Sequence, residues 1–306
     1  MWTYILKRLL HGLFSIIGAS LLIFVITRLT GDPVAMLLPP EATEEMVRQM
    51  RATLGLDRPI WEQYLIFASH ALQGDLGMSY RWEMPALTLL LDRLPATIQL
   101  ASAGLLFSIS VAVPLGVLSA VYRGSWIDRV GKTLAMAGQA MPNFWVGLIL
   151  ILVFSVSLGW LPAYGSGSFR HLILPAIALG SYPVAAQTRI VRSSMLDVLD
   201  SDYIKMGRIL GASESVLVWK YAFRNAAVPL ITVLGVYFAA MLGGTFVVEV
   251  IFAWPGVGRT VVEAVFARDF PVVQAGVLFT SVVFVTVNLL VDLSYGVIDP
   301  RARVNV

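Results

Sequence analysis

Six segments of the chain are almost wholly apolar, and their lengths constrain the fold more than any other feature. Each has about 20 residues or more, enough for a helix rising 1.5 Å per residue to cross a hydrocarbon core roughly 30 Å thick. Of the 306 residues, 58% are hydrophobic and 13% charged, whereas soluble domains are about half apolar and about a quarter charged. We therefore expect an all-α integral membrane protein with six transmembrane helices. They are predicted at Leu9–Leu29, Thr97–Tyr122, Thr133–Leu158, Leu172–Val191, Val228–Ile251 and Ala275–Ile298.

The basic residues of the short connections lie mainly on one side of the predicted membrane. If the N-terminus is cytosolic, the two short outer loops carry only Arg170, Arg259 and Arg268. Because basic loop residues favour the cytosol, we expect both termini there. The first segment follows Lys7 and Arg8 and lacks a small-residue cleavage site, which predicts a retained first span and not a removable signal.

The stretch between the first two spans is long enough to hold structure of its own. Glu41–Leu54 and Pro59–Gly74 are each predicted to form a helix, and Asp75, Gly77 and Pro85 break the pattern afterwards. We expect a small extracytoplasmic helical insertion here. The predicted organisation is an N-terminus and first span over 1–29, the insertion over 30–94, a five-span core over 95–298 and a cytosolic tail over 299–306.

A polar element, Asp202–Pro229, lies between two of the apolar segments. Its first part has the pattern of a short helix with one charged and one apolar face. Gly211 can end that helix in a left-handed conformation, Ser213 can cap a second helix, and Pro229 is expected to open the next span. A simple turn needs far fewer residues, so we expect a docking surface for a separate protein. The charged face comprises Asp202, Lys205 and Arg208, and the apolar face Tyr203, Met206 and Leu210.

Motifs for chemistry within the chain are missing from the sequence. There is no cysteine, and the three histidines have no ligand spacing, so we expect no metal site. Gly131-Lys132-Thr133 resembles the tail of a phosphate-binding loop, but Trp126 stands where that motif needs a glycine. We therefore expect a chain that is not an enzyme and binds no cofactor itself. If transport is active, a partner must hydrolyse the nucleotide.

Asn288 and Asp292 lie four residues apart on one face of the last segment. Proton relays use ionisable groups at mid-depth, whereas Asp292 lies near the inner end. We interpret the pair as structural hydrogen-bonding residues. Two alternatives stay open: an ion-coupled secondary transporter or channel that acts alone and depends on Asp292, and a membrane anchor that transports nothing.

Four sets of residues, in this order and spacing, resemble permease subunits of binding-protein-dependent ABC importers of the dipeptide, oligopeptide and nickel type. The resemblance covers nearly the whole chain. The sets are Tyr4–Leu10 with Thr30–Pro33; Leu54–Pro59 with Gly74–Gly77; Asp202–Ala212 with Arg224–Ala226 and Pro229; and Val248–Gly258 with Asn288–Asp292 and Asp299–Arg301.

The resemblance implies a type I importer fold, a bacterial inner-membrane location and a set of partners. These are a second homologous permease, two ABC ATPase subunits that carry ATP and Mg, an external solute-binding protein and membrane lipid; no nucleic acid is implied. The proposed mechanism is alternating access. Relatives handle dipeptides and oligopeptides, glutathione, nickel, glycosides or opines, and the sequence leaves the cargo open.

The resemblance also implies two functional regions. Gly211 is similar to the glycine of the EAA loop, which inserts into an ATPase groove, so we name residues of about 199–227 the coupling loop. The family's alanines before this glycine are missing, and Gly207 costs about 1 kcal/mol of helix propensity, which puts in doubt which ATPase is accepted. The implied contacts are Asp202, Tyr203, Lys205, Arg208, Gly211, Ala212, Arg224 and Asn225.

The second region follows the fifth span and is named the outer loop. One interpretation makes it a wall of the translocation path touched by the binding protein, and the other a tight loop that re-enters and packs. Proline fixes the backbone angle φ and glycine permits backbone conformations closed to other residues, and both properties are compatible with either interpretation. The candidate residues are Glu249, Phe252, Trp254, Pro255, Gly256 and Gly258.

Overall fold

The computed structural model describes residues 2–30, 34, 38–39 and 42–298. Throughout these ranges the regular structure is helical, apart from one isolated β-bridge between Met78 and Pro85. The predicted all-α class is therefore confirmed. The chain divides into two compact units, which are described separately.

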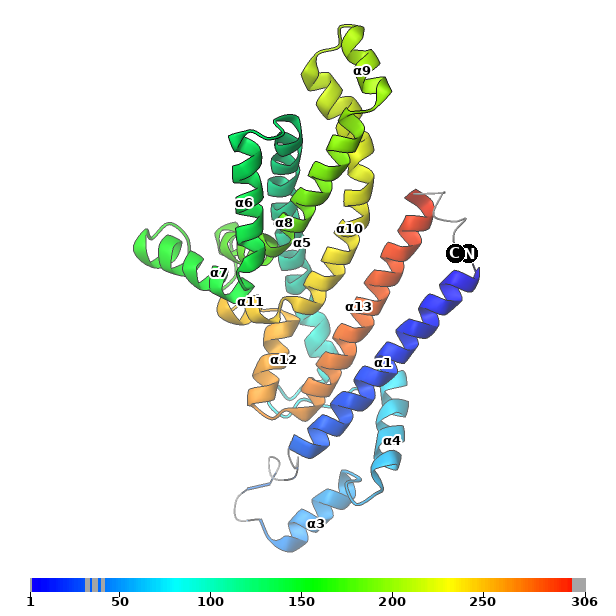
Figure 1. The fold of residues 1–306 in the computed structure, drawn as a ribbon. Coiled ribbons are helices and arrows are strands. Elements are labelled where there is room, and N and C mark those ends of the chain that lie inside the picture. Colours follow the sequence, from blue (N-terminus) through cyan, green and yellow to red (C-terminus); the bar gives the residue numbers. More distant parts are fainter. Residues whose placement is uncertain (1, 31–33, 35–37, 40–41, 299–306) are drawn as a thin grey trace. The chain divides into compact units, whose positions relative to one another are not determined.

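The first unit comprises the chain up to Thr97 together with Pro255–Leu289. Its long helices α1 and α13 run antiparallel: the Gln274 side-chain amide donates to Thr27 Oγ1 over 2.5 Å near one end, and Gly12 faces Val285 further along (Figure 1). The unit holds α1 (Trp2–Thr30), α3 (Glu44–Thr53), α4 (Ile60–Leu72), the start of α5 (Ala86–Val121), α12 (Val257–Phe266) and most of α13 (Phe270–Ile298).

The two helices predicted in the insertion are confirmed as α3 and α4. The break after them is confirmed too, since Met78 and Pro85 form the bridge. A buried carboxylate holds this loop: Asp269 accepts hydrogen bonds from Ser79 Oγ over 2.5 Å and from the Arg81 backbone N–H over 3.1 Å. These contacts anchor the loop before α5 to the residue that precedes α13, although the two lie far apart in sequence.

The second unit comprises Ile98–Trp254 and the end of α13. Within it α5 and α8 run parallel in close contact: Gly104 faces Leu179 and Gly180, and Gly116 faces Val191. Small residues allow membrane helices to approach in this way. The unit holds α6 (Trp126–Ala140), α7 (Asn143–Leu150), the π-helix η1 (Ile151–Ser157), α8 (Phe169–Leu199), α9 (Asp202–Ile209), the π-helix η2 (Val216–Ala222), α10 (Phe223–Gly244) and α11 (Phe246–Ile251).

Three of the described helices are long and apolar enough to cross a membrane: Leu6–Thr30, Ala86–Val121 and Phe270–Val291. The number rises to five if each of two bent pairs is one span. These pairs are Trp126–Ala140 with Asn143–Ser157, bent by 104°, and Val216–Ile231 with Val233–Gly244, bent by 40°. The six-span count therefore stays a prediction.

Several predicted boundaries differ from the observed helices, among them the end of the fifth segment, where α10 stops at Gly244 and not at Ile251. Three of the differences have a clear physical reason. The segment Thr133–Leu158 is not one helix, because Met141 is extended (φ −97°, ψ 129°) ahead of Pro142, and proline disfavours helical geometry in the residue before it. The helix predicted from Thr97 begins at Ala86, inside the predicted insertion, since its first turns carry the fully buried Leu89 and Leu90.

The third boundary lies at Pro229, which was expected to open a span but is inside α10. That helix continues from η2 without a gap and ends at Gly244. Membrane helices tolerate an internal proline where neighbours satisfy the freed backbone group. The coupling loop is therefore continuous with α10 as well as close to the end of α8.

The contact between α5 and α8 yields a test of the packing. A Cβ at Gly180 would overlap the carbonyl oxygen of Gly104. We expect Gly180→Ala to lower the free energy of unfolding by about 1–3 kcal/mol, as overpacking does, which thermal unfolding of the purified protein in detergent would measure. Gly244→Ala is the control, because nothing lies within 4 Å of a Cβ there; equal effects of the two substitutions would contradict the packing.

Candidate functional site

The first helix of the coupling loop ends in a two-bond cap built around Gly211. α9 begins after Ser201 and ends at Ile209, and Gly211 has φ +84°. The Gly211 N–H donates to the Arg208 carbonyl over 3.1 Å, and the Ala212 N–H to the Gly207 carbonyl over 3.0 Å. This is the Schellman pattern, which favours glycine at the left-handed position. The predicted helix and its glycine stop are confirmed, and the next helical turn begins directly after Ser213.

A buried isoleucine, not the predicted apolar face, attaches α9 to the rest of the unit. Ile204 is fully buried in a cluster drawn from α5, α8, α9, η2 and α10. Gly207 also belongs to this contact, because a Cβ there would lie 2.7 Å from Leu217 Cδ2. The glycine that looked like a departure from the family therefore has a local packing reason. The other cluster members are Val117, Ala120, Val191, Met195, Val218, Ala222, Ala226 and Leu230.

Polar contacts join α9 to the second helix of the loop. The Asn225 side-chain amide donates to Tyr203 Oη over 2.8 Å and to the Tyr221 carbonyl over 3.1 Å. Arg208 contacts both carboxylate oxygens of Glu214, at 2.5 and 3.1 Å, and this hydrogen-bonded contact lowers the pKa of Glu214. The structure thus brings Tyr203 and Asn225 together, and it adds Glu214, which the sequence analysis missed.

The remaining predicted contacts are exposed. Lys205 Nζ lies 3.4 Å from Asp202 Oδ1, a pair open to solvent on both sides, and such pairs contribute little to stability. The Arg224 side chain is exposed too. These charges are free to meet another molecule.

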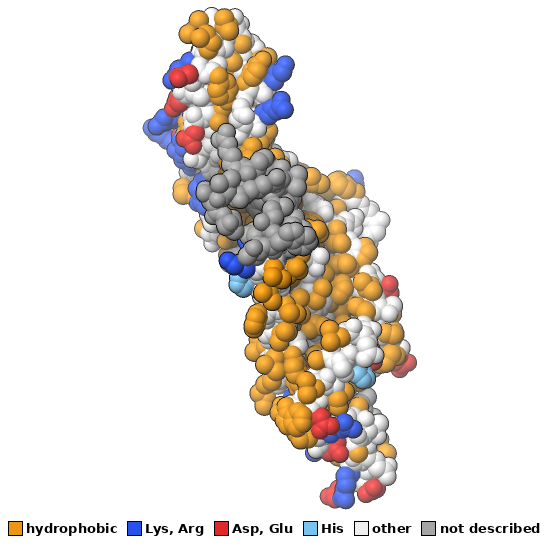
Figure 2. Space-filling view, turned by 90° about the vertical axis from the view of Figure 1, so that its right-hand side faces the viewer, with side chains coloured by type: hydrophobic (Ala, Val, Ile, Leu, Met, Phe, Trp, Pro, Cys, Tyr) orange, Lys and Arg blue, Asp and Glu red, His pale blue; other side chains and the backbone are white. Residues whose placement is uncertain are grey.

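Large apolar side chains cover the outside of α9. Tyr203, Met206, Ile209 and Leu210 are 48%, 55%, 79% and 78% exposed. Figure 2 shows hydrophobic side chains with basic ones beside them at the end of the molecule where Figure 1 places α9. Contiguous exposed apolar patches rimmed by polar residues mark interaction sites. We name Tyr203, Met206, Ile209 and Leu210 the α9 patch.

The part of the outer loop that belongs to the second unit, up to Trp254, is tightly packed. Glu249, Phe252 and Trp254 are at most 3% exposed. Glu249 accepts a hydrogen bond from Thr245 Oγ1 over 2.9 Å, the Phe252 carbonyl accepts from the Gly165 N–H over 2.9 Å, and the Phe252 ring lies against Gly147 of α7. These contacts favour the interpretation as a packed loop; contact with a binding protein stays a prediction.

The glycines of the outer loop do not use the conformations expected of them. The positive φ falls on Ala253, at +50°. Gly256 is extended, with φ −98°, and precedes the helix that contains Gly258. Both glycines are buried and Pro255 is half-buried, and neither glycine has a positive φ.

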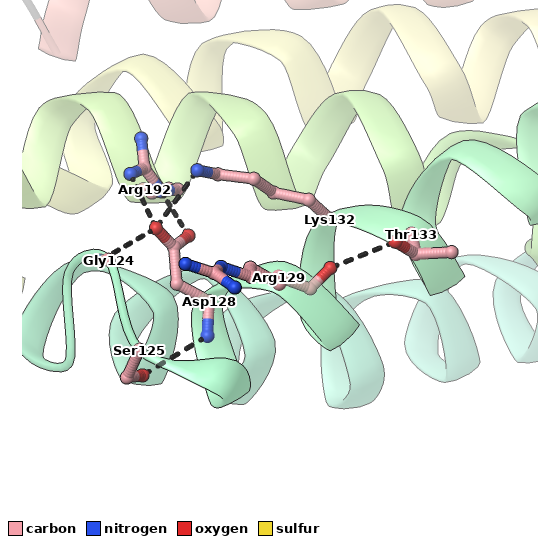
Figure 3. A network of polar contacts seen from close by, with 7 residues as sticks. All are labelled: Gly124, Ser125, Asp128, Arg129, Lys132, Thr133 and Arg192. Atoms are coloured by element: carbon pink, nitrogen blue, oxygen red, sulfur yellow. Dashed lines mark hydrogen bonds and ion pairs between the residues drawn. The ribbon is translucent and has the colours of Figure 1, made fainter.

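A buried ion-pair network ties α6 to α8, and the sequence analysis missed it (Figure 3). Asp128 is 2% exposed and accepts from Arg192 Nε over 2.9 Å and Nη2 over 3.1 Å, and from Lys132 Nζ over 2.9 Å. The Gly124 N–H also donates to it, over 3.1 Å. Only the local part could have been foreseen: Ser125 caps the helix that carries Asp128, whereas Arg192 is 64 residues away in sequence.

The network also accounts for the triplet that resembled a phosphate-binding loop. Gly131-Lys132-Thr133 lies within α6, where Lys132 pairs with Asp128 and Thr133 donates to the Arg129 carbonyl over 3.0 Å. A helix interior cannot cradle a phosphate with its backbone N–H groups. Among the described residues no group of His, Cys, Asp or Glu could hold a metal ion.

The polar pair of the last span is described only in part. Asn288 donates to the Phe284 carbonyl one turn earlier, over 2.9 Å, which is a local helix contact. The side chain of Asp292 lies outside the described residues, so its structural role stays a prediction.

Two family descriptions and a set of curated relatives match the chain. Residues 112–304 match "Binding-protein-dependent transport system inner membrane component", and residues 1–101 match the N-terminal part of such membrane components. The chain is similar to the glutathione transport system permease protein GsiC of Escherichia coli O6:H1, with 40% identity over 99% of both chains. It is equally similar to GsiC of Salmonella typhi, at 40% identity over 99% of both.

A solved structure supports the fold. The inward-facing MetNI methionine ABC transporter aligns with a TM-score of 0.58 and 19% identity, over 70% of this chain and 97% of that one. The helices of the two proteins are therefore arranged in a similar way. At 19% identity this similarity supports the fold alone.

The network at Asp128 yields a stability test. Asp128→Ala leaves the largely buried Arg192 without its carboxylate, so we expect a loss of about 3–5 kcal/mol in the free energy of unfolding, measured by thermal unfolding in detergent. Lys132→Ala removes an ion pair whose lysine is 45% exposed, and we expect about 0–1 kcal/mol. If the two variants unfold alike, the α6–α8 contact does not depend on this carboxylate.

Proposed function

Because this chain belongs to the binding-protein-dependent transport system inner membrane components, we propose that it forms, with a second homologous permease, the path for ATP-driven uptake of a small peptide-like solute. It is a multi-pass inner-membrane permease subunit of an ABC importer. The proposal covers its partners, its cargo and the role of the coupling loop. Both termini are assigned to the cytosol on the distribution of basic residues.

The main support for the proposal is that the coupling loop has both a buried residue that holds α9 in place and an exposed apolar patch on its outside. Ile204 fixes α9 to the helices of the second unit, while the α9 patch and the charges of Asp202 and Lys205 face outward. A solvent-exposed apolar face on a rigidly held helix suits a groove in a soluble partner. We assign this partner to an ABC ATPase subunit.

The partner set follows from the same assignment. Two ATPase subunits bind ATP and Mg and drive the cycle, and an external solute-binding protein delivers the cargo. This chain holds no nucleotide and no cofactor of its own. Asp202, Lys205 and Arg224 would fix the register of the docked ATPase by charge complementarity.

Helix continuity gives the docking site a route to the translocation path. Only two residues separate the end of α8 at Leu199 from Asp202, and η2 continues directly into α10. Arg192 on α8 is tied to α6 by Asp128, so displacement of α9 would carry α6, α8 and α10 with it. Alternating access then needs only two arrangements of the group formed by α6, α8, α9 and α10, one for each nucleotide state of the ATPase.

The cargo is assigned to small peptides on the strength of the relatives. The full-length relatives at about 40% identity carry the name of glutathione transport systems, and glutathione is a tripeptide. The test is mass spectrometry of the ligand that co-purifies with the cognate binding protein. A small peptide is expected, and nickel or a glycoside would overturn the assignment.

Gly211 offers a direct test of docking. Its Cβ position has no atom of the chain within 4 Å, so Gly211→Asp places a charge where the ATPase would sit without a clash inside the chain. We expect normal amounts of membrane-inserted protein and loss of solute uptake, measured with labelled cargo in cells.

Gly159→Asp is the matched control, because Gly159 also has a positive φ, of +65°, and open space around it. It carries the same strain and the same charge outside the coupling loop, so uptake should persist. Loss of protein from the membrane in Gly211→Asp alone would mean that this glycine is merely structural. Uptake driven by an ion gradient in liposomes without ATPase subunits would favour the secondary transporter instead.

A further inference from the structure

Helix α4 packs against the membrane-crossing helix α1 through one face. Tyr64 Oη lies 3.0 Å from Ser20 Oγ, and the rings of Tyr64 and Phe67 lie 5.4 and 5.7 Å from that of Phe24. Ala71, one turn further along α4, packs with Ile23 against the core of the first unit. This face of α4 is therefore set along α1 between Ser20 and Phe24.

The level of this contact lies inside the span of α1. Leu6–Thr30 is the apolar span. The Arg28 guanidinium near its end lies 5.3 Å from the centroid of the Phe24 ring, and because a guanidinium avoids the bilayer interior, it places Phe24 at the edge of the hydrocarbon core. Ser20 precedes Phe24 by about one helical turn, so it lies about 6 Å further in at 1.5 Å per residue. Helices that lie in a membrane interface are buried to about 5–10 Å.

A second apolar stripe on α4 has no contact that would cover it within the described residues. Trp61, Leu65 and Leu72 are 64%, 58% and 90% exposed and fall on one face at offsets of four and eleven residues. The neighbouring helix α3 differs: it begins with Glu44 and Glu45 at a Thr43 cap and is strongly polar. Of the two, only α4 carries a second apolar face beside the one that packs on α1.

Exposed apolar residues of α1 lie at the same level as the contact with α4. Leu22 and Ile26 are 63% and 45% exposed, and in a membrane-crossing helix such side chains face lipid. Charged pairs occur only towards the ends of α4: Arg58 with Glu62 at 2.9 Å before its middle, and His70 with Asp75 at 3.1 Å after it. The middle of α4, residues 63–69, therefore carries no charged side chain.

We propose that α4 is not part of an aqueous insertion but lies in the lipid leaflet that holds the Thr30 end of α1, with Trp61, Leu65 and Leu72 in contact with acyl chains. Tryptophan is enriched at this depth because its ring is amphipathic. The proposal differs from the prediction that the whole of 30–94 is extracytoplasmic, and it leaves α3 in water. It is independent of the cargo and of the ATPase.

The natural absence of cysteine makes a depth measurement direct. Leu65→Cys carries a nitroxide spin label in the full chain, assembled with its partner subunits in liposomes. Collision rates with oxygen, which concentrates in lipid, and with a neutral nickel chelate, which stays in water, give the depth. Leu22→Cys on α1 is the lipid reference, and Arg48→Cys on the exposed surface of α3 is the water reference.

We expect the oxygen-to-nickel ratio at Leu65→Cys to match that at Leu22→Cys and to exceed that at Arg48→Cys. A ratio equal to that at Arg48→Cys would place α4 in water and overturn the proposal. Low collision rates with both reagents would mean that another protein covers the stripe, which overturns it equally. Trp61→Cys repeats the measurement at a second position, so a local disturbance at Leu65 cannot decide the result.

Discussion

Burial of Ile204 is the contact on which the arrangement of the coupling loop depends. A short helix such as α9 is unstable alone in water, and fixing a helix of eight residues costs conformational entropy that its own hydrogen bonds do not repay. The fully buried Ile204 side chain and the close approach of Gly207 to Leu217 supply the missing stabilisation. Because this anchor faces inward, Met206 and Leu210 remain outside and available.

Local signals in the coupling loop were predictable, and long-range partners were not. Gly211 adopts the left-handed conformation that ends α9. This could be predicted from the sequence, because glycine is the residue most often found at that position of a helix end. Asp128 and Arg192 could not be paired in advance, since their contact depends on how α6 and α8 pack. Similarly, the charge pattern of α9 was visible, but whether Ile204 or Tyr203 faces inward required the neighbouring helices.

The predicted span boundaries were wrong where a proline or the burial of side chains outweighed the hydropathy of the segment. An apolar run predicts a span by length, yet Pro142 splits one such run because it forces the preceding residue out of helical geometry. The opposite error occurred at Ala86, where α5 begins early: Leu89 and Leu90 are buried against the first unit's core, and burial extended the helix through a stretch that contains Asp92 and Arg93.

Hydropathy alone also cannot tell whether an exposed apolar surface faces lipid or another protein. The surfaces of α4 and α9 differ in this respect. The α9 patch is small and rimmed by charges such as Lys205 and Arg208, which suits a soluble protein with a complementary groove. The α4 stripe is free of charge across its middle and level with the lipid-facing Leu22 of α1. The deciding quantity is the depth of the helix relative to a membrane span, and a packed pair such as Tyr64 and Ser20 fixes that depth.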